Sequence, residues 1–393
     1  MSKDNSKEME ICMWANVLPP DYGGGGKAAL RYAKMLTNMG HRVTIFSSTK
    51  NPQQVEETNI NTYYLRNAQK STNKIYKVIS CLALFIKLIV YFDLSKFDVI
   101  HLYSTTLYSC IFSAAANISG VRTVMELNNS MSDSPSEIKK EDAGWLKLYL
   151  ISYVDCYIAV SPNLKDKCER SKYFDGRCYL VQNTIDPHQF KSDKSVSGKP
   201  KMLSRRFDNI IVSVGILNQN KNQEEILRIF ELVENRIPSS CLVLVGPKSQ
   251  DEENKMYTDK LVSIASKCGL RDKLFMTGLV DNVDIWLNIA DVFLFSSKSE
   301  GLPLSVLEAM SCGVPCVIKK LDTTSSYIIN HTRDGYIYDD IKQASTYVLH
   351  LIENPDLSNK VSNNARNKVL KKFTHKIKVN KYIDIYSKMC NIK

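Results

Sequence analysis

Short hydrophobic runs alternate with longer segments of mixed polarity along nearly the whole chain. Apolar runs of about four to eight residues are typical of strands buried on both faces, and the segments between them have the spacing of amphipathic helices. This alternation predicts β-α-β units and therefore an α/β fold with parallel sheets. The predicted strands are residues 11–17, 43–46, 99–102, 123–126, 156–160, 178–181, 210–214, 241–245, 274–277, 292–295 and 315–318.

A polar, basic segment with glycine and proline, KSDKSVSGKPKMLSRRF at residues 191–207, separates two groups of predicted strands. Because 393 residues exceed the roughly 100–200 of a usual domain, we expect two domains joined there. The predicted boundaries are 1–190 for the N-terminal domain, 191–207 for the linker and 208–372 for the C-terminal domain. Residues 373–393 carry apolar side chains at helical spacing, and we expect this helix to return to the N-terminal domain.

The composition, with 44% hydrophobic and 24% charged residues, is that of an ordinary soluble globular protein. The net charge of +11 is spread over both halves without a basic stripe or a nucleic-acid-binding motif. We therefore expect phosphorylated ligands or an anionic membrane surface as partners, and no nucleic acid. The 11 cysteines form no CxxC pair and mostly lie in apolar runs, which indicates a reducing compartment and neither a disulfide framework nor a metal site.

The first residues, MSKDNSKEMEICMWANV, lack the apolar core of a signal peptide, which predicts a cytoplasmic protein. The most apolar long segment, residues 78–92, has 15 residues with Lys87 among them. A bilayer span needs about 20, so we expect no membrane crossing. With Lys70, Lys74 and Lys77 nearby, this predicted helix either covers a sheet or rests on the inner face of the cytoplasmic membrane, and the sequence leaves both open.

Open parallel sheets bind ligands beyond the carboxyl ends of their strands, so chemistry is expected in the segments that follow strands. One such segment is SEGLPLSVLEAMSCGVP, residues 299–315. Pro303 favours a helix that begins near residues 303 and 304, and the stiff turn before it leaves the amides of Gly301 to Ser305 facing a ligand. Glu300 lies in this turn, and Glu308, one turn into the helix, can accept hydrogen bonds from hydroxyl groups.

Two further turns after predicted strands carry glycines. In PPDYGGGGKAAL, Gly23 and Gly24 open a helix, so backbone amides and the positive end of the helix dipole meet there. In SVGILNQNK, Gly215 follows a strand, and Lys221 six residues later places a cation at the mouth of the sheet. Both turns are therefore candidate sites for a phosphorylated ligand.

Together the three segments resemble family 4 of the glycosyltransferases, also called group 1, and weaker similarity covers essentially the whole chain. The motifs that carry the resemblance are a glycine pair whose helix ends in Gly-His, a Gly-x5-Lys segment, and Glu-x7-Glu followed by Met-x-Cys-Gly-x-Pro. The resemblance implies the GT-B fold, in which two Rossmann-like doubly wound domains face a central cleft. It also implies that a nucleotide-diphosphate sugar binds the C-terminal domain and that the acceptor binds the N-terminal domain.

The resemblance also implies roles for individual residues. Glu300 is expected to contact the donor sugar, Lys221 the diphosphate and Glu308 the ribose of the nucleotide, and catalysis is expected to depend on Glu300 and Lys221. The other expected donor-binding residues are Gly23, Gly24, Gly215, Gly301, Leu302, Pro303, Leu304 and Ser305.

Two positions depart from the family pattern. Ile216 stands where the family has an arginine on the diphosphate, and Asn128, which we place on the acceptor side, stands where many relatives have a histidine near the donor sugar. His101 follows a predicted strand, but a buried structural histidine is the favoured interpretation. Asp281 and Asp284 are not spaced like the Asp-x-Asp that holds a divalent ion in GT-A enzymes, so neither a metal nor a cofactor is expected.

The expected activity is the transfer of a hexose-type sugar from a nucleotide-diphosphate donor to a glycan or lipid-linked acceptor, with retention of anomeric configuration, in surface polysaccharide or glycoconjugate biosynthesis. Two alternatives stay open. One is a nucleotide-sugar epimerase of GT-B fold, and the other is a non-catalytic sugar-nucleotide-binding subunit.

Overall fold

The structure is a computed structural model that divides into two compact units. The first unit comprises Met1–Gln182 and His375–Lys393, and the second comprises Asn183–Thr374. The structure describes residues 8–18, 24–49, 60–65, 74–128, 133–141, 143–174, 177–193, 203, 206–248 and 256–390.

The first unit contains a seven-stranded parallel sheet with the order β3-β2-β1-β4-β5-β6-β7. The chain builds outward from β1 in one direction and then crosses to β4 and builds in the other. The switch in strand order therefore lies between β1 and β4, which is where an open α/β sheet leaves a crevice for a ligand. The strands are β1 Glu10–Ala15, β2 Arg42–Ser47, β3 Ile60–Tyr64, β4 Val99–Leu102, β5 Arg122–Leu127, β6 Cys156–Ala159 and β7 Cys178–Leu180.

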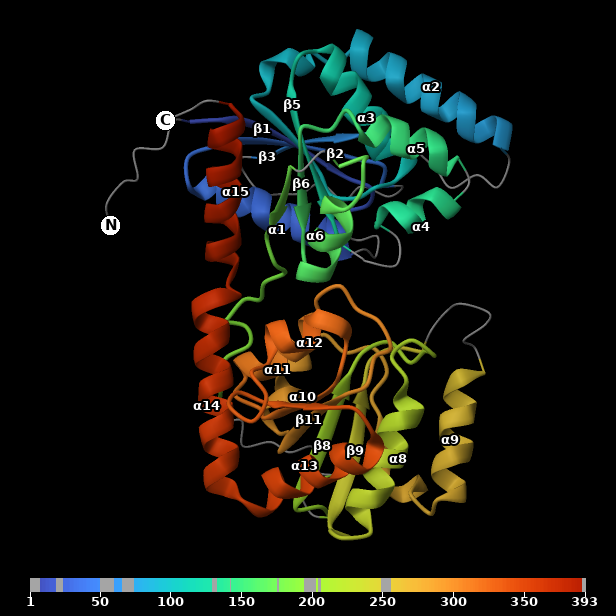
Figure 1. Ribbon diagram of the computed structural model, residues 1–393, viewed down its shortest axis with the longest axis vertical. Helices are drawn as coiled ribbons and strands as arrows, with labels where there is room; N and C mark the ends of the chain where they lie inside the picture. Colours follow the sequence, from blue (N-terminus) through green and yellow to red (C-terminus); the bar gives the residue numbers. More distant parts are fainter. Residues whose placement is uncertain are drawn as a thin grey trace. The chain divides into compact units, whose positions relative to one another are not determined.

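Helices cover both faces of this sheet (Figure 1), because successive strand residues alternate between the faces and both sets are apolar. One face packs against α1, Gly24–Asn38, and α15, His375–Met389. The other face packs against a second group of helices. These are α2 Lys74–Val90, α3 Leu107–Ile118, α4 Pro135–Lys140, α5 Gly144–Ile151 and α6 Pro162–Glu169, with a short 3-10 turn at Leu94–Lys96.

The second unit repeats this architecture with a six-stranded parallel sheet of order β10-β9-β8-β11-β12-β13, so its switch lies between β8 and β11. Helices α10, α11, α12 and the end of α14 pack on one face, and α8, α9 and α13 pack on the other. The strands are β8 Asn209–Val214, β9 Ser240–Val245, β10 Leu274–Met276, β11 Val292–Phe295, β12 Cys316–Lys319 and β13 Tyr336–Tyr338. The helices are α8 Gln223–Glu234, α9 Tyr257–Lys267, α10 Val283–Asn288, α11 Leu304–Ser311, α12 Asp322–Ile328, α13 Ile341–Glu353 and α14 Pro355–Lys372, with a 3-10 turn at Arg271–Lys273.

The predicted α/β class with parallel sheets is confirmed, and each predicted strand is present. Two edge strands were missed. β3, INTYY, alternates half-buried with exposed residues and has polar Asn61 and Thr62 after its first residue, so it lacks the apolar run of a central strand. β13 has only three residues, YIY, which is too short for a periodicity to register.

The boundary between the units lies earlier than the predicted 190. Residues 183–190 belong to the second unit because Ile185 and Phe190 are buried in its core, and the Ile185 amide donates to the Phe373 carbonyl. The predicted linker, 191–207, lies largely outside the described residues, but Leu203 and Phe207 at its end also pack in the second core. At the far end Phe373 is buried there too, so the tail that joins the first unit begins at His375.

A buried polar cluster fastens α15 to the first sheet. The Lys378 ammonium lies 3.0 Å from a Glu126 carboxylate oxygen, and both side chains are 1% exposed. The Tyr382 hydroxyl donates to the other Glu126 oxygen, and His101 Nδ1 lies 2.5 Å from the Tyr386 hydroxyl. His101 is fully buried, which agrees with the structural role expected from the sequence.

Electrostatics within this cluster favour an ion pair beside a neutral imidazole. Burial raises the pKa of Glu126, but the Lys378 ammonium, the neighbouring His101 imidazole and the hydrogen bond from Tyr382 outweigh that effect and hold the pKa at about 2. Burial alone would lower the pKa of the Lys378 ammonium. The neighbouring Glu126 carboxylate has the opposite effect, and the net result is a pKa above the ordinary value. For His101, burial is the largest effect and its pKa is lowered. Glu126 and Lys378 are therefore both charged at neutral pH.

Lys378→Met should destabilise the first unit by about 3–5 kcal/mol, because it leaves the Glu126 carboxylate buried without its cation. Lys376→Met, on the same helix but exposed, should change the stability by no more than about 0.5 kcal/mol. Thermal unfolding of the three proteins at neutral pH measures both effects. Equal melting temperatures for the two variants would show that the buried pair contributes nothing.

The loss of stability caused by Lys378→Met, relative to the native protein, should become smaller as the pH falls. In the native protein the folded-state pKa of Glu126 lies below its ordinary 4.5, so the stability that it contributes is present above pH 4.5 and is lost as the pH falls toward 2. In the variant, burial is unopposed by Lys378 and raises the pKa of Glu126, so the variant gains relative stability over the same range.

Candidate functional site

The carboxyl ends of β8 and β11 meet at the strand-order switch of the second sheet, and Lys221 and Glu300 come together there. Lys221 Nζ lies 2.6 Å from Glu300 Oε1, and the two side chains are 25% and 17% exposed. Both groups are therefore shielded by the protein and still open to a ligand. Of the predicted site residues, Lys221 and Glu300 form a direct ion pair although 79 positions separate them along the chain.

The backbone on either side of Lys221 is held in a fixed turn. The Lys221 amide donates to the side-chain oxygen of Asn218, and Asn222 has a left-handed backbone with φ of 55°. The Ser296 hydroxyl, just after β11, lies 2.9 Å from the carbonyl oxygens of Lys221 and Asn222. The aliphatic part of Lys221 packs over Gly215, where an added Cβ would lie 3.4 Å from its Cδ and Cε.

Asn220 joins this turn to the one that carries Glu300. Its side-chain amide donates to the Ser299 carbonyl at 3.1 Å, and its own carbonyl accepts from the Lys298 amide at 2.8 Å. The two turns therefore form one hydrogen-bonded unit that fixes Lys221 and Glu300 relative to one another. The sequence offered no signal for this coupling, because asparagine and serine in a polar loop are ordinary surface residues.

The turn after Glu300 runs into α11. The helix begins at Leu304 and Pro303 is its N-cap, with φ of −70° and ψ of 109°, so the predicted start is confirmed and the proline lies one position before the first helical residue. Among the described residues, the amides of Gly301, Leu302, Leu304 and Ser305 donate to no backbone carbonyl outside the helix. These amides are available to an anionic or hydroxylated ligand at the positive end of the α11 dipole.

Two other predicted residues lie close to this turn. Leu302 is buried, and its carbonyl accepts from the Asn183 side chain at 3.5 Å. Glu308 lies on α11, one turn from its start, and is partly buried. The structure thus brings Lys221 and Glu300 together at the carboxyl edge of the second sheet, and Glu308 lies one turn into the helix that follows Glu300.

Glycines line the carboxyl ends of β8, β9 and β10. A Cβ on Gly246 would lie 2.2 Å from the Gly215 carbonyl oxygen, and its φ is +145°. Gly246 also bridges to Gly278, whose φ is +71°. The strand ends approach one another this closely only because no side chain stands between them, and Gly215 is thereby set at the base of the Lys221 turn.

The glycine-rich turn of the first unit precedes α1, which begins at Gly24. Gly23 lies outside the described residues. A Cβ on Gly26 would lie 1.7 Å from the Val17 carbonyl oxygen, and one on Gly25 would lie 3.5 Å from the Tyr103 carbonyl oxygen. The start of α1 is therefore pressed against the turns after β1 and β4, at the switch of the first sheet.

Asn128 follows β5 at the same edge of the first sheet. Its amide donates to Asp133 Oδ2 at 2.7 Å, and its side chain donates to the Tyr103 carbonyl at 3.4 Å. The other Asp133 oxygen accepts from the Thr105 hydroxyl at 2.7 Å. Asp133 is 7% exposed and organises the turns after β4 and β5. Sequence reasoning missed it, since an aspartate in a serine-rich loop is typical of a surface turn.

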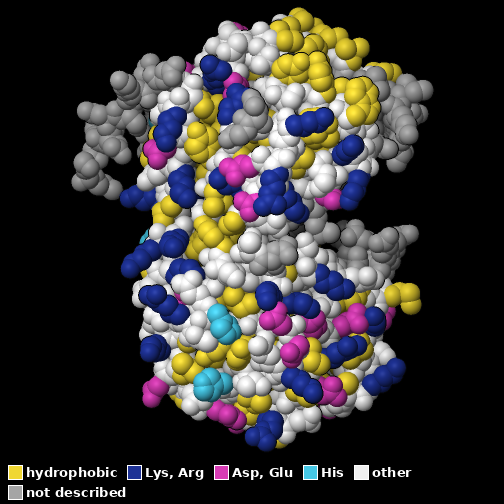
Figure 2. All heavy atoms as spheres, in the orientation of Figure 1, with side chains coloured by type: hydrophobic (Ala, Val, Ile, Leu, Met, Phe, Trp, Pro, Cys, Tyr) yellow, Lys and Arg dark blue, Asp and Glu magenta, His cyan; other side chains and the backbone are white. Residues whose placement is uncertain are grey.

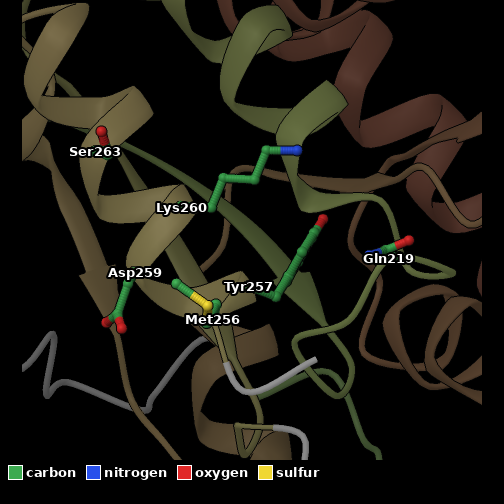
Figure 3. A pocket seen from close by; sticks show the side chains of 6 residues that line it. All are labelled: Gln219, Met256, Tyr257, Asp259, Lys260 and Ser263. Atoms are coloured by element: carbon green, nitrogen blue, oxygen red, sulfur yellow. The ribbon is translucent and has the colours of Figure 1, made fainter. Parts of the chain in front are cut away.

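A surface pocket of about 460 Å³ lies beside the Lys221 turn (Figure 3). It contains none of the predicted site residues. Its side chains come from Gln219 and from the first turns of α9, where the Tyr257 hydroxyl and the Lys260 ammonium both contact Glu224. The lining residues are Gln219, Met256, Tyr257, Asp259, Lys260 and Ser263. They hold no buried charge directed into the pocket, so its chemistry is less specific than that of Lys221 and Glu300.

Metal ligation has no support among the residues that the structure describes, since no three His, Cys, Asp or Glu side chains there are grouped to hold an ion. Independence from a metal remains a prediction.

Two protein-family models match the chain in tandem. The model for Glycosyltransferase Family 4 matches residues 22–189, and the model for Glycosyl transferases group 1 matches residues 199–368. The second match contains Lys221, Glu300 and Glu308, and the first contains Asn128 and the glycine-rich turn.

Two curated relatives align over most of their own length. The chain is 24% identical over 303 residues to UDP-Gal:alpha-D-GlcNAc-diphosphoundecaprenol alpha-1,3-galactosyltransferase of Escherichia coli, covering 75% of this chain and 76% of that protein. It is 22% identical over 376 residues to N-acetyl-alpha-D-glucosaminyl L-malate synthase of Bacillus anthracis, covering 93% and 94%.

Solved structures share the architecture of both units. HepE from Anabaena, in complex with UDP and glucose, has a TM-score of 0.76 and 15% identity, covering 97% of this chain and 100% of its own. Sucrose-phosphate synthase from Thermosynechococcus elongatus has a TM-score of 0.80 and 15% identity, covering 98% and 100%. At this identity the likeness shows the fold, which is GT-B with two Rossmann-like domains.

Gly246→Ala should destabilise the second domain more than Gly269→Ala does. Both replace a glycine with φ in the left-handed half of the map, which costs about 1–2 kcal/mol, but a Cβ at Gly269 meets nothing within 4 Å. At Gly246 the clash with the Gly215 carbonyl adds about 1–3 kcal/mol. Thermal unfolding of both variants measures the difference, and equal losses would mean that the strand ends can move apart without cost.

Proposed function

The chain belongs to family 4 of the glycosyltransferases, the group 1 enzymes, and we propose that it transfers a hexose-type sugar from a nucleotide-diphosphate donor to a glycan or lipid-linked acceptor with retention of anomeric configuration. The observation that carries the proposal is the Lys221–Glu300 pair at the strand-order switch of the second domain, beside the unpaired amides that precede α11. A cation, a carboxylate and amide donors at one edge suit a ligand that has a phosphate end and a hydroxylated end.

Lys221 acts on the leaving group. When the bond between the sugar and the diphosphate breaks, negative charge builds on the phosphate oxygens, and the ammonium stabilises that charge more strongly than it stabilises the ground state. Because the ammonium has three N–H donors, it can hold Glu300 and a phosphate oxygen at once. The amides of Gly301, Leu302, Leu304 and Ser305 and the α11 dipole add to the same stabilisation.

Glu300 acts at the other end of the donor. Its carboxylate accepts hydrogen bonds from the hydroxyl groups of the sugar and lies near the anomeric carbon, where positive charge develops. Glu308 accepts from the ribose hydroxyls. The ion pair with Lys221 fixes the position of Glu300, so the sugar is oriented by a group that is itself held in place.

No general base is needed if the departing phosphate takes the proton of the acceptor hydroxyl on the same face of the sugar, which is the outcome that retention requires. We propose that the reaction uses neither a metal nor a cofactor and that its product enters a surface polysaccharide or glycoconjugate. The names of the relatives support the substrate class, since the Escherichia coli enzyme is named for UDP-Gal and a diphosphoundecaprenol acceptor. A structural neighbour binds UDP and glucose.

A panel of nucleotide-sugars screened by thermal shift identifies the donor, because a ligand that binds only the folded state raises the melting temperature. The donor found is then incubated with and without a lipid-linked or glycan acceptor, in the presence of EDTA, and the product linkage is assigned by NMR. Transfer with retention supports the proposal. An inverted linkage, an epimer formed without acceptor, or binding without any transfer each overturns it in favour of a different mechanism or function.

Lys221→Ala and Glu300→Ala should each lower kcat by at least about tenfold, which is roughly 1.4 kcal/mol of barrier, with little change in melting temperature. A matched control is Lys273→Ala, which breaks the ion pair with Glu234, since those two side chains are similarly exposed at 23% and 20% but belong to a different edge of the sheet. The control should keep wild-type turnover. Wild-type turnover in either site variant would remove the pair from the mechanism.

Ile216→Arg should restore the second cation of the family pattern and raise kcat/KM for the donor by about tenfold, or roughly 1.4 kcal/mol. Ile216 is partly exposed beside Gly215, so a longer side chain has room. Ile216→Leu changes shape without adding charge and should leave the kinetics unchanged. If both variants behave alike, the missing arginine has no consequence in this protein.

A further inference from the structure

An apolar stripe runs along the outer side of α2 in the first domain. Ile79, Leu82, Ile86, Ile89 and Val90 follow the spacing of one helix face, and they are 38–66% exposed. Leu84 and Leu88, on the opposite side of the same helix, are buried in the core. The helix thus has an inner apolar face that packs on the sheet and an outer apolar face with no protein partner among the described residues.

An aromatic stripe continues this surface on α5. Trp145 and Tyr149 on α5 and Tyr153, two residues beyond its end, recur every fourth residue and are 73%, 56% and 43% exposed. The rings of the two tyrosines contact at 5.3 Å, and their hydroxyls are 2.7 Å apart. Such aromatic side chains combine an apolar ring with a polar tip, which suits the boundary between water and lipid.

The two stripes lie on the same side of the first domain, because α2 and α5 both pack on α3 and their inner faces share one core. Figure 2 shows hydrophobic side chains gathered over α2 and α5 of Figure 1, with lysine and arginine side chains at the border. Together the eight residues form what we call the α2–α5 face, comprising Ile79, Leu82, Ile86, Ile89, Val90, Trp145, Tyr149 and Tyr153.

Charge near this face is predominantly positive. Neither α2 nor α5 contains an acidic residue. Lys87 lies on α2, and α4, which contacts α5, ends in the exposed Lys139 and Lys140. The carboxylates on α4 and at its end are paired, Glu137 with Lys140 and Glu141 with Lys147, and Asp93, just beyond the end of α2, accepts from the Ser95 amide. An anionic surface therefore meets cations at the rim and apolar side chains at the centre.

We propose that the α2–α5 face docks on the surface of an anionic phospholipid bilayer, with the apolar stripe and the aromatic rings at the level of the headgroups and the lysines on lipid phosphates. No helix among the described residues is long and apolar enough to span a membrane, so the contact is peripheral. The mixture of aliphatic, aromatic and cationic side chains favours lipid over a glycan, since aliphatic side chains such as Ile86 and Val90 offer sugars neither stacking nor hydrogen bonds.

Helix α5 lies close in the chain to the edge of the first sheet that carries Asn128. Asn128, Asp133 and α5 all lie in the connection between β5 and β6, which leaves the carboxyl edge of the first sheet. Docking through Trp145 and Tyr149 therefore brings the edge that carries Asn128 close to the membrane, where a lipid-linked acceptor resides. This consequence rests on the proposed function, whereas the docking itself does not.

Vesicle flotation with the full chain tests the docking. In the absence of donor, we expect at least about tenfold more protein bound to vesicles of phosphatidylcholine with phosphatidylglycerol than to phosphatidylcholine alone, and less binding as salt rises. Ile86→Glu with Val90→Glu should abolish the binding. Because both residues are exposed, the double variant should keep its melting temperature.

Two variants provide matched controls, Met39→Glu at the end of α1 and Leu370→Glu on α14. Both replace an exposed hydrophobic residue, at 40% and 39% against 47% for Ile86, that lies outside the α2–α5 face, and both should bind vesicles normally. A second readout is the fluorescence of Trp145, which should shift to shorter wavelength with anionic vesicles, and the shift should vanish in Trp145→Phe.

The outcomes separate the docking from the proposed activity. Failure of wild-type protein to bind anionic vesicles, or equal binding by the Ile86→Glu, Val90→Glu variant, overturns the docking. So does a dimer in solution that this variant dissociates, or binding to a soluble glycan without binding to vesicles. Transfer to a water-soluble acceptor should be unchanged in the double variant, so a loss there points to damage at the active site instead.

Discussion

The hydrogen-bonded ladder of parallel strands is the constraint on which the rest of this protein depends. Because every strand points the same way, all strands end at the same edge of the sheet. The turns that follow these carboxyl ends lie outside the sheet and are open to a ligand. In the second domain the order switches between β8 and β11, so two turns that are distant in sequence meet side by side. The ion pair between Lys221 and Glu300 is a direct product of that switch.

Position alone would leave two long side chains free to move, and the polar residues around them remove that freedom. Asn218, Asn220 and Ser296 bind backbone atoms of the neighbouring turns, so the cation and the carboxylate are presented by a rigid frame. Rigidity matters here because electrostatic stabilisation of a departing phosphate is efficient only when the donors are already oriented.

The sequence predicted the fold class, the central strands and the start of the helix after Glu300, because buried strands and helix starts leave local patterns. It did not predict β3, which is a half-exposed edge strand. It also did not predict the boundary between the units near residue 183, which depends on Ile185 and Phe190 packing in the core of the second unit. The Glu126–Lys378 pair was equally hidden, as 252 positions separate its members and each looks like a surface charge in isolation. Contacts that form only in the folded protein leave no periodic pattern in the sequence.

The helices on the two faces of the first sheet differ in how much apolar surface they leave exposed, and folding alone does not account for this difference. On one face α15 covers the sheet, and its Tyr382 and Tyr386 are buried with their hydroxyls bonded to Glu126 and His101. On the other face α2 and α5 complete the core with their inner sides and still present hydrophobic side chains outward. Exposed apolar surface of this extent favours association and carries a cost in solubility. One face of the sheet is covered so completely that even the ammonium of Lys378 is buried. The exposed apolar side chains of α2 and α5 on the other face are therefore best explained by a surface on which they dock.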